Sequence, residues 1–186
     1  MVSALSTIAY GFLWGMPHIS TLFLHMSFLS MAAYFLWPQR DKLIQGCGSP
    51  LKRVLLGVGL FILMVAAALC ANLVAIHFGF SDQAKVVEVV STLPLYLIIL
   101  SFTIAPISEE LLFRALMVPR IGVPISTLLF MMVHSAYGSG VEFIGAFFLG
   151  FVLANAYYYL EDPVPCIIAH ALFNALSISI MFWVIG

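Results

Sequence analysis

A run of 23 residues without a single charge, at positions 54–76, constrains this chain more than any other feature. A helix needs about 20 apolar residues to cross the hydrocarbon core of a membrane, and this run is long enough. Three further apolar runs of comparable length follow, at 89–107, 143–160 and 164–185. Backbone groups in lipid must be hydrogen-bonded within the structure, and the short alternating segments of a barrel are missing from this sequence, so we expect transmembrane helices.

The composition agrees with a lipid environment, because 63% of the residues are hydrophobic and 8% are charged. A soluble domain usually carries about 25% charged residues, which it needs to cover its surface. We therefore predict an all-α integral membrane protein with one domain over residues 1–186: helices without a recognisable motif over 1–85, and a core over 86–186. The net charge of −1 indicates no nucleic-acid partner. The expected location is the plasma membrane, or the inner membrane of a prokaryote, with several passes.

Two regions leave the number of spans open at six or seven. Residues 1–36 are apolar but interrupted at Gly15-Met16-Pro17-His18, so they form one long span or two short ones. A charged helix at 108–119 is followed by an apolar stretch at 121–137. Four basic residues share one loop, which the positive-inside rule places in the cytoplasm: Arg40, Lys42, Lys52 and Arg53. The loop at 78–88 is then expected outside.

Most charges lie in loops, but Glu109, Glu110 and Arg114 are flanked by apolar runs on both sides. A charge at the bilayer centre costs about 2.5–3.5 kcal/mol even on the mildest scale, so these three need a reason to be there. Glu110 and Arg114 are four residues apart and can pair on one helix face. Glu109 is turned by about 100° and points elsewhere. The alternative is an interfacial helix with a solvated ion pair.

Polar side chains also interrupt two apolar runs: His134 in the first, and His170 with Asn174 in the second. His170 and Asn174 are four residues apart and share a helix face. Each could simply be a satisfied buried group or a hydrogen bond between helices. Three other histidines lie near expected span ends or breaks and are interpreted as interfacial, with low functional weight: His18, His25 and His77.

Taken together, a carboxylate, two imidazoles and a carboxamide suit hydrolysis of an amide by water. A glutamate can take a proton from water, and histidine and asparagine can donate hydrogen bonds to the oxyanion that forms. No serine or cysteine has an evident base as partner, which disfavours an acyl-enzyme route.

The order Glu-Glu-x-x-x-Arg, Phe-x-x-x-His and His-x-x-x-Asn on separate membrane helices resembles the CPBP family of intramembrane proteases. This family includes type II CAAX prenyl endopeptidases and Abi-type bacteriocin-processing or bacteriocin-immunity proteins. The resemblance covers about residues 90–180, the second half of the chain. It implies an intramembrane endopeptidase that cuts a membrane-associated, C-terminally anchored or CAAX-like peptide or protein.

The resemblance also implies a role for each matching residue. Glu109 would be the general base, and Glu110 would orient it while held by Arg114. His134 would bind the water or assist proton transfer, and His170 and Asn174 would form the oxyanion hole; Phe130 would pack within the second motif. Ala115 departs from the glycine that many members have there.

The family is described both as metalloproteases and as glutamate-dependent proteases. His134, His170 and Glu109 could hold Zn²⁺ with a position left for water. No His-Glu-x-x-His motif is present, and the asparagine suits an oxyanion hole better than a zinc shell. We therefore favour a mechanism without a cofactor.

The depths of these residues pose a difficulty for straight spans. A span at 89–107 would end at the cytoplasmic face and place Glu109 there, while the following span would carry His134 toward the other side. A re-entrant or strongly tilted helix at 108–119 would bring them together, with break points at Pro106, Pro119 and Pro124.

A stripe of small residues, Ala146, Gly150 and Ala154, recurs every four positions and predicts a close helix contact. Two other classes of function compete with the protease: a non-catalytic immunity or scaffold protein on the same fold, and a proton-linked carrier. Against the carrier, the sequence shows no inverted halves.

Overall fold

The computed structural model describes residues 17–185, and every regular element in that range is helical. The interruption expected at residues 15–18 therefore lies partly outside the described residues. In chain order the elements are α2 (Pro17–Leu36), η1 (Trp37–Gln39), α3 (Arg40–Gln45), α4 (Pro50–His77), α5 (Gln83–Ser91), α6 (Leu95–Phe102), α7 (Ile104–Glu109), η2 (Glu110–Met117), α8 (Val118–Val133), η3 (His134–Tyr137), α9 (Gly140–Leu160) and α10 (Pro163–Ile185).

 

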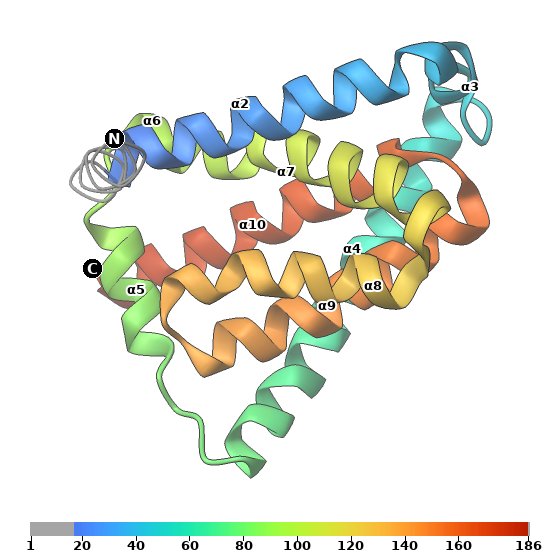
Figure 1. The fold of residues 1–186 in the computed structure, drawn as a ribbon. Coiled ribbons are helices and arrows are strands. Elements are labelled where there is room, and N and C mark those ends of the chain that lie inside the picture. The colour runs from blue at the N-terminus through green and yellow to red at the C-terminus, as the bar shows by residue number, and fades with distance from the viewer. Residues whose placement is uncertain (1–16, 186) are drawn as a thin grey trace.

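Five helical stretches of the described residues are long and apolar enough to cross a membrane. One of them, 104–136, contains Gly122, whose backbone (φ 80°, ψ 165°) is not helical. Figure 1 shows the chain reversing there, so that α8 runs back along η2. The stretch at 104–136 therefore runs out and back at Gly122 and is not one straight span. The protein is a multi-pass helical membrane protein.

Helix α4 shows how the bundle divides its surface between lipid and protein. One face carries apolar side chains that are 62–68% exposed: Leu51, Leu55, Ile62, Leu69 and Leu73. The opposite face is buried and made mostly of small residues: Gly57, Met64, Ala71 and Ala75. Lipid tails solvate the first face, and the small residues let a neighbouring helix approach closely.

The small-residue stripe predicted on α9 is confirmed. Ala146, Gly150 and Ala154 are all buried, and a Cβ added at Gly150 would lie 2.8 Å from Cδ1 of Phe130 on α8. The absence of a side chain at Gly150 therefore makes room for the phenylalanine of the second motif. A similar close approach joins α4 and α10, where a Cβ on Gly57 would lie 2.7 Å from Cγ2 of Ile168.

One end of the bundle is held by Asp162, between α9 and α10. Its carboxylate accepts hydrogen bonds from the backbone N–H groups of Cys47 (2.9 Å) and Val164 (3.0 Å) and pairs with Arg53 at 2.8 Å. Burial raises the pKa of Asp162, but the two N–H groups and the guanidinium outweigh it and leave the pKa below its ordinary value. The carboxylate therefore fixes the α3–α4 loop to the start of α10.

The other end is held by Asp82, just before α5. It accepts hydrogen bonds from the N–H groups of Gly140 (3.0 Å) and Val141 (3.2 Å) and from the hydroxyl of Ser139 (2.9 Å), which lowers its pKa. Lys85 adds a bond to the carbonyl of Gly138 at 3.0 Å. The segment before α5 is thus fixed to the start of α9.

The difficulty that straight spans posed for Glu109 is resolved by the path of the chain. The apolar run at 89–107 is not one straight span: it is divided among α5, α6 and α7, with a break at Thr103 (φ −117°, ψ −78°). Helices α6, α7 and η2 then continue in the same direction across the bundle (Figure 1). Glu109 consequently lies midway along a pass, not at its cytoplasmic end, and the motif helix needs no re-entrant turn.

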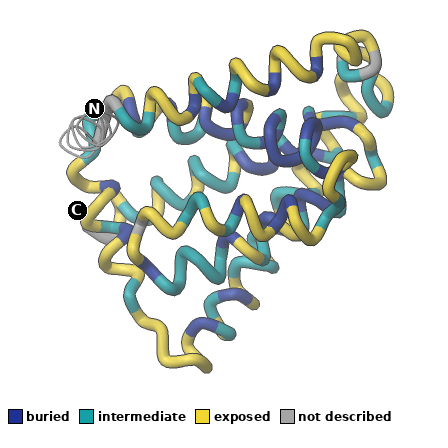
Figure 2. Tube along the Cα trace, in the orientation of Figure 1, coloured by how far each residue is buried: buried dark blue, intermediate teal, exposed yellow. Residues whose placement is uncertain are grey.

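The buried residues concentrate where α7 and η2 run between the other helices, as Figure 2 shows. The largest buried cluster includes Leu112, Phe113 and Leu116 from η2, together with residues of α2, α8, α9 and α10. The Glu-Glu-x-x-x-Arg segment is therefore surrounded by protein, which is how a membrane protein accommodates charges at this depth.

Candidate active site

Glu110 and Arg114 form the ion pair that their spacing predicts. The Arg114 Nε lies 2.9 Å from Glu110 Oε2, and both side chains are completely buried. The second oxygen, Oε1, accepts a hydrogen bond from His170 Nδ1 at 2.9 Å. Glu110 thus connects the first motif to the third, and its two oxygens are used by two different partners.

The pair lies on an unusual piece of helix. Residues Glu110–Met117 form a π-helix, which begins directly after Glu109. In a π-helix the hydrogen bonds join residues i and i+5, so it is wider than an α-helix, and such segments are frequent at functional sites. Glu110 and Arg114 both belong to this segment, so the wide turn directs both charged side chains toward the centre of the bundle.

Phe130 covers the buried guanidinium. The Arg114 Cζ lies 4.4 Å from the centre of the phenylalanine ring, a cation–π arrangement. The ring also packs edge-on against Phe113 and lies beside the rings of His134 and His170, at 4.5 Å and 6.0 Å between centroids. This position matches the packing role predicted for Phe130 and places one aromatic ring between all three motifs.

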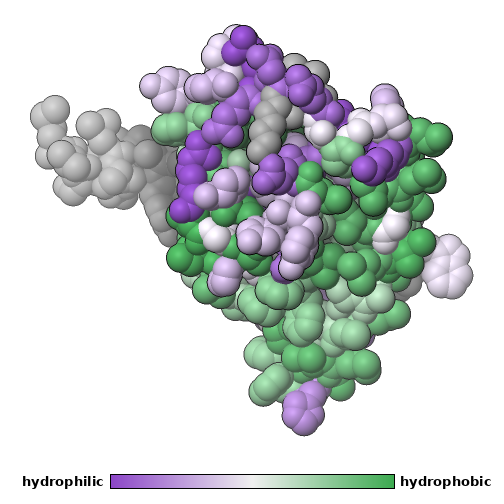
Figure 3. All heavy atoms as spheres, turned by 90° about the vertical axis from the view of Figure 1, so that its right-hand side faces the viewer, coloured by the Kyte–Doolittle hydropathy of each residue, from purple (hydrophilic) through white to green (hydrophobic). Residues whose placement is uncertain are grey.

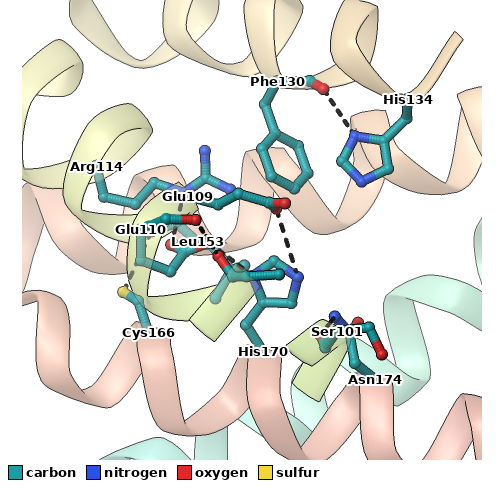
Figure 4. Close-up of polar contacts among 12 residues, drawn as sticks. Ser101, Glu109, Glu110, Arg114, Phe130, His134, Leu153, Cys166, His170 and Asn174 are labelled. Atoms are coloured by element: carbon teal, nitrogen blue, oxygen red, sulfur yellow. Dashed lines mark hydrogen bonds and ion pairs between the residues drawn. The ribbon is translucent and has the colours of Figure 1, made fainter. Parts of the chain in front are cut away.

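Glu109 points away from the pair, as the helix geometry requires, and lies between two histidines. Its Oε2 is 3.9 Å from His170 Nε2, and its Oε1 is 3.9 Å from His25 Nδ1. The side chain is 12% exposed, so this carboxylate is the more accessible of the two. Figure 4 shows its carboxylate directed toward His134 and His170, with Arg114 and Glu110 behind it.

His25 is the main residue that sequence reasoning missed. It was expected at a membrane interface, but it lies inside α2, is 7% exposed, and its Nδ1 is 2.8 Å from the hydroxyl of Ser108. Ser108 Oγ also donates to the carbonyl of Ala105, so the histidine N–H is the donor in its contact with the serine. The sequence contains a signal for this position, because His25, like His170, is a histidine with apolar neighbours within a span, and such residues are usually functional. Of the other two, His77 is exposed at the end of α4, and the side chain of His18 lies outside the described residues.

His134 approaches the site from η3, just after α8. Its Nδ1–H donates to the carbonyl of Phe130 at 2.9 Å, which makes Nε2 the accepting nitrogen of the neutral ring. Figure 4 shows the ring on the side of the site toward which Glu109 points. Glu142, in the first turn of α9, lies within electrostatic range of His134, Glu109 and His170, and it belongs to none of the three sequence motifs.

Asn174 lies one turn beyond His170 on α10, as predicted, but its amide is engaged elsewhere. The Nδ2 donates to the carbonyl of Ser101 at 2.8 Å, near the end of α6. This bond satisfies a carbonyl next to the break at Thr103. The structure therefore brings Glu109, Glu110, Arg114, Phe130, His134 and His170 together and places Asn174 at the margin of the group.

A metal site at Glu109, His134 and His170 does not fit this arrangement. Among residues 17–185, no three His, Cys, Asp or Glu side chains come close enough together to hold a metal ion. His170 uses Nδ1 for the bond to Glu110, so it could offer a metal only Nε2. Independence of a metal stays a prediction.

Comparison with known proteins gives one match. The model of the family described as type II CAAX prenyl endopeptidase Rce1-like matches residues 91–176, the part of the chain that carries all three motifs. The resemblance drawn from these motifs is thereby confirmed over residues 91–176, and the matched family is a family of proteases. No curated protein and no solved structure matches the chain.

Proposed function

We propose that this protein is an intramembrane endopeptidase in which Glu109 activates water for attack on a peptide bond. The observation that carries the proposal is the pair of buried carboxylates with different partners. Glu110 is bound by Arg114 and His170 at 2.9 Å each, while Glu109 has two imidazoles at 3.9 Å. One carboxylate is thus held in place, and the other keeps room for a water molecule and a substrate.

In the first step, an oxygen of Glu109 takes a proton from water while the water oxygen bonds to the carbonyl carbon of the substrate. His134 Nε2 accepts a hydrogen bond from the other O–H of this water, which stays on the attacking oxygen, and so orients the water. The carbonyl oxygen becomes an oxyanion, and a fixed donor nearby stabilises it in the transition state. In the second step the C–N bond breaks, and the proton held by Glu109 passes to the leaving amine.

His170 is the proposed donor to the oxyanion. Its Nδ1–H is directed at Glu110, so in the imidazolium form Nε2–H points to the Glu109 side of the ring. An imidazolium there would balance the charge of the second carboxylate, since Arg114 balances the first. Asn174 is a second proposed donor, and it would act through the N–H that its bond to Ser101 leaves over.

The proposed substrate is a peptide or protein in the membrane or anchored to it, with CAAX-like C-terminal tails included. Support for this class comes from the family match and from the position of the site, which is surrounded by membrane-spanning helices. In the scaffold alternative, the buried pair of Glu110 and Arg114 serves stability alone. The two functions therefore differ in whether Glu109 is needed as a base.

The Glu109→Gln variant tests the proposal. It preserves shape but removes the base, and we expect cleavage to fall by at least about a hundredfold, within the range for loss of a general base. The assay follows new termini by mass spectrometry in membranes with the purified protein, with a prenylated Cys-a-a-X peptide as a defined probe. Glu88→Gln, on the exposed face of α5, is the matched control and should keep full activity.

Equal cleavage by the Glu109→Gln variant and the parent chain would contradict the proposed base. Retention of folding is checked by the elution of both variants in detergent as single species. A chain that binds a membrane partner, generates no new termini and is indifferent to Glu109→Gln would be the scaffold.

A further inference from the structure

One polar residue, His25, lies on the buried face of α2. Among the described side chains of this helix, the buried ones recur every three or four positions and share one face: His25, Phe28, Ala32 and Leu36. Hydrophilic residues elsewhere gather on the surface, as Figure 3 shows for the end of the bundle that carries α3, where solvent satisfies them. His25 has no such access, and a polar group inside a membrane span is usually paired with other groups of the protein.

The register of α2 against the motif helix places His25 beside the proposed base. Phe28, one turn further along α2, packs edge-on against Phe113 of η2, with 5.6 Å between the ring centroids. Phe113 follows Glu109 by one turn, and the two helices run side by side in the same direction (Figure 1). His25 therefore lies at the level of Glu109, and its Nδ1 is 2.8 Å from the hydroxyl of Ser108 and 3.9 Å from Glu109 Oε1.

Ser108 holds the imidazole independently of the base. The serine hydroxyl gives its own hydrogen to the carbonyl of Ala105 at 2.9 Å, so it accepts the Nδ1–H of His25. Both side chains are buried, and Ser108 is completely so. Because this hydrogen bond joins two packed helices, it keeps the N–H of His25 in one place while water and substrate come and go at the carboxylate.

The distance between His25 and Glu109 suits orientation of the carboxylate and not tight binding. At 3.9 Å the N–H is too far from Oε1 for a hydrogen bond, so this oxygen keeps its lone pairs, while the positive edge of the imidazole still attracts it. His170 faces the other oxygen, Oε2, also at 3.9 Å. The carboxylate therefore lies between two imidazoles, and one of them comes from a helix outside the matched segment 91–176.

We propose that His25 is a positioning residue for the reaction: anchored by Ser108, it holds the carboxylate of Glu109 in the orientation in which it takes a proton from water. This inference rests on the proposed function and adds a residue of α2 to it. His25 does not contact the substrate and exchanges no proton in either step. The segment 91–176 is therefore incomplete as a catalytic unit without α2.

Three substitutions of His25 in the full chain test this role, with kcat and KM for a prenylated Cys-a-a-X peptide as the readout. His25→Leu removes the N–H and should lower kcat by about tenfold or more, with KM within about twofold of the parent value, because the orientation of the base matters in the transition state. His25→Asn puts an amide N–H where the imidazole has Nδ1–H and should restore kcat to within about threefold of the parent chain. His25→Gln, whose amide reaches the position of Nε2, should not restore it.

Ser108→Ala removes the anchor and keeps the imidazole, and we expect kcat to fall by about three- to tenfold. Ser27→Ala is the matched control. Ser27 also donates to a backbone carbonyl, that of Phe23 at 2.7 Å, but it comes two residues after His25 and so faces away from Glu109. This variant should keep the kcat of the parent chain.

An unchanged kcat in His25→Leu, or an equal loss in His25→Leu and His25→Asn, would overturn the inference, because the N–H at Nδ1 would then have no role. Recovery by His25→Gln alone would overturn it too. Elution in detergent as a single species shows that each variant is folded. If His25→Leu fails this check, equal kcat for Ser108→Ala and Ser27→Ala overturns the inference.

The Glu109→Gln variant in the same assay separates this inference from the proposed function. Loss of cleavage in Glu109→Gln with full cleavage in the His25 and Ser108 variants would support the protease and overturn the role of His25. Equal cleavage by Glu109→Gln and the parent chain, or no cleavage by the parent chain here and in the terminus assay, would overturn both.

Discussion

The buried pair of Glu110 and Arg114 allows a prediction whose size follows from the structure. Arg114→Met keeps the length and apolar stem of the side chain but leaves the carboxylate of Glu110 in a fully closed environment with His170 as its remaining partner. Removing one member of a buried pair typically costs about 3–5 kcal/mol, because the other charge is left uncompensated. The contact of the guanidinium with Phe130 is lost as well. We expect the free energy of unfolding to fall by about 3–5 kcal/mol.

The double variant Glu110→Gln/Arg114→Met separates this effect from lost packing. With both charges removed, most of the stability should return, since replacing a buried pair by uncharged groups is often neutral or stabilising. The exposed pair Arg40–Asp41 gives the matched control, because Arg40 also lies over an aromatic ring, Trp37. Arg40→Met should cost about 0–1 kcal/mol, as is usual for exposed pairs.

Unfolding in mixed micelles, followed by circular dichroism against the fraction of denaturing detergent, measures all four chains. An Arg114→Met variant as stable as Arg40→Met would refute the reasoning. A double variant no more stable than Arg114→Met would also refute it, because the lost stability would then not come from the uncompensated charge of Glu110.

Two further predictions concern residues that contact the site. His25→Ala should lower cleavage by about tenfold or more, since an imidazole 3.9 Å from Glu109 is lost, while His77→Ala at the exposed end of α4 should leave cleavage unchanged in the same terminus assay. Gly150→Ala should lower the free energy of unfolding by about 1–3 kcal/mol, because the added Cβ would overlap the ring of Phe130 at 2.8 Å, whereas Gly145→Ala on the same helix meets nothing within 4 Å. Equal cleavage by the two histidine variants would contradict the role of the His25–Glu109 contact. Equal stability of the two glycine variants would contradict the close packing of Gly150 on Phe130.

The sequence predicted those features that depend on local spacing. Long apolar runs located the spans, because a chain that crosses lipid must be apolar and must hydrogen-bond its backbone groups within its own helix. The four-residue spacing of Glu110 and Arg114 predicted their pairing, and the small residues of α9 predicted a close contact. Each of these follows from the periodicity of one helix and needs no knowledge of its neighbours.

Features that depend on the arrangement of several helices were predicted less well. His25 reaches Glu109 from a helix more than 80 residues earlier, and no local pattern specifies that α2 lies beside α7. The bond from Asn174 to the carbonyl of Ser101 depends on the break at Thr103, which leaves a carbonyl near the end of α6 in need of a donor. The roles of the site residues stay predictions.

The reversal at Gly122 explains how the first two motifs meet, which straight spans could not. Glu109 lies 13 residues before this glycine and His134 lies 12 residues after it, so the two arms carry both side chains about equally far from the turn. A positive φ of 80° is open to glycine at little cost, and Pro124 follows closely to start the returning arm. The spacing between the first and second motifs is therefore fixed by the length of one hairpin, whereas α10 supplies His170 from a separate helix, and Glu110 joins it to that hairpin through the hydrogen bond at 2.9 Å.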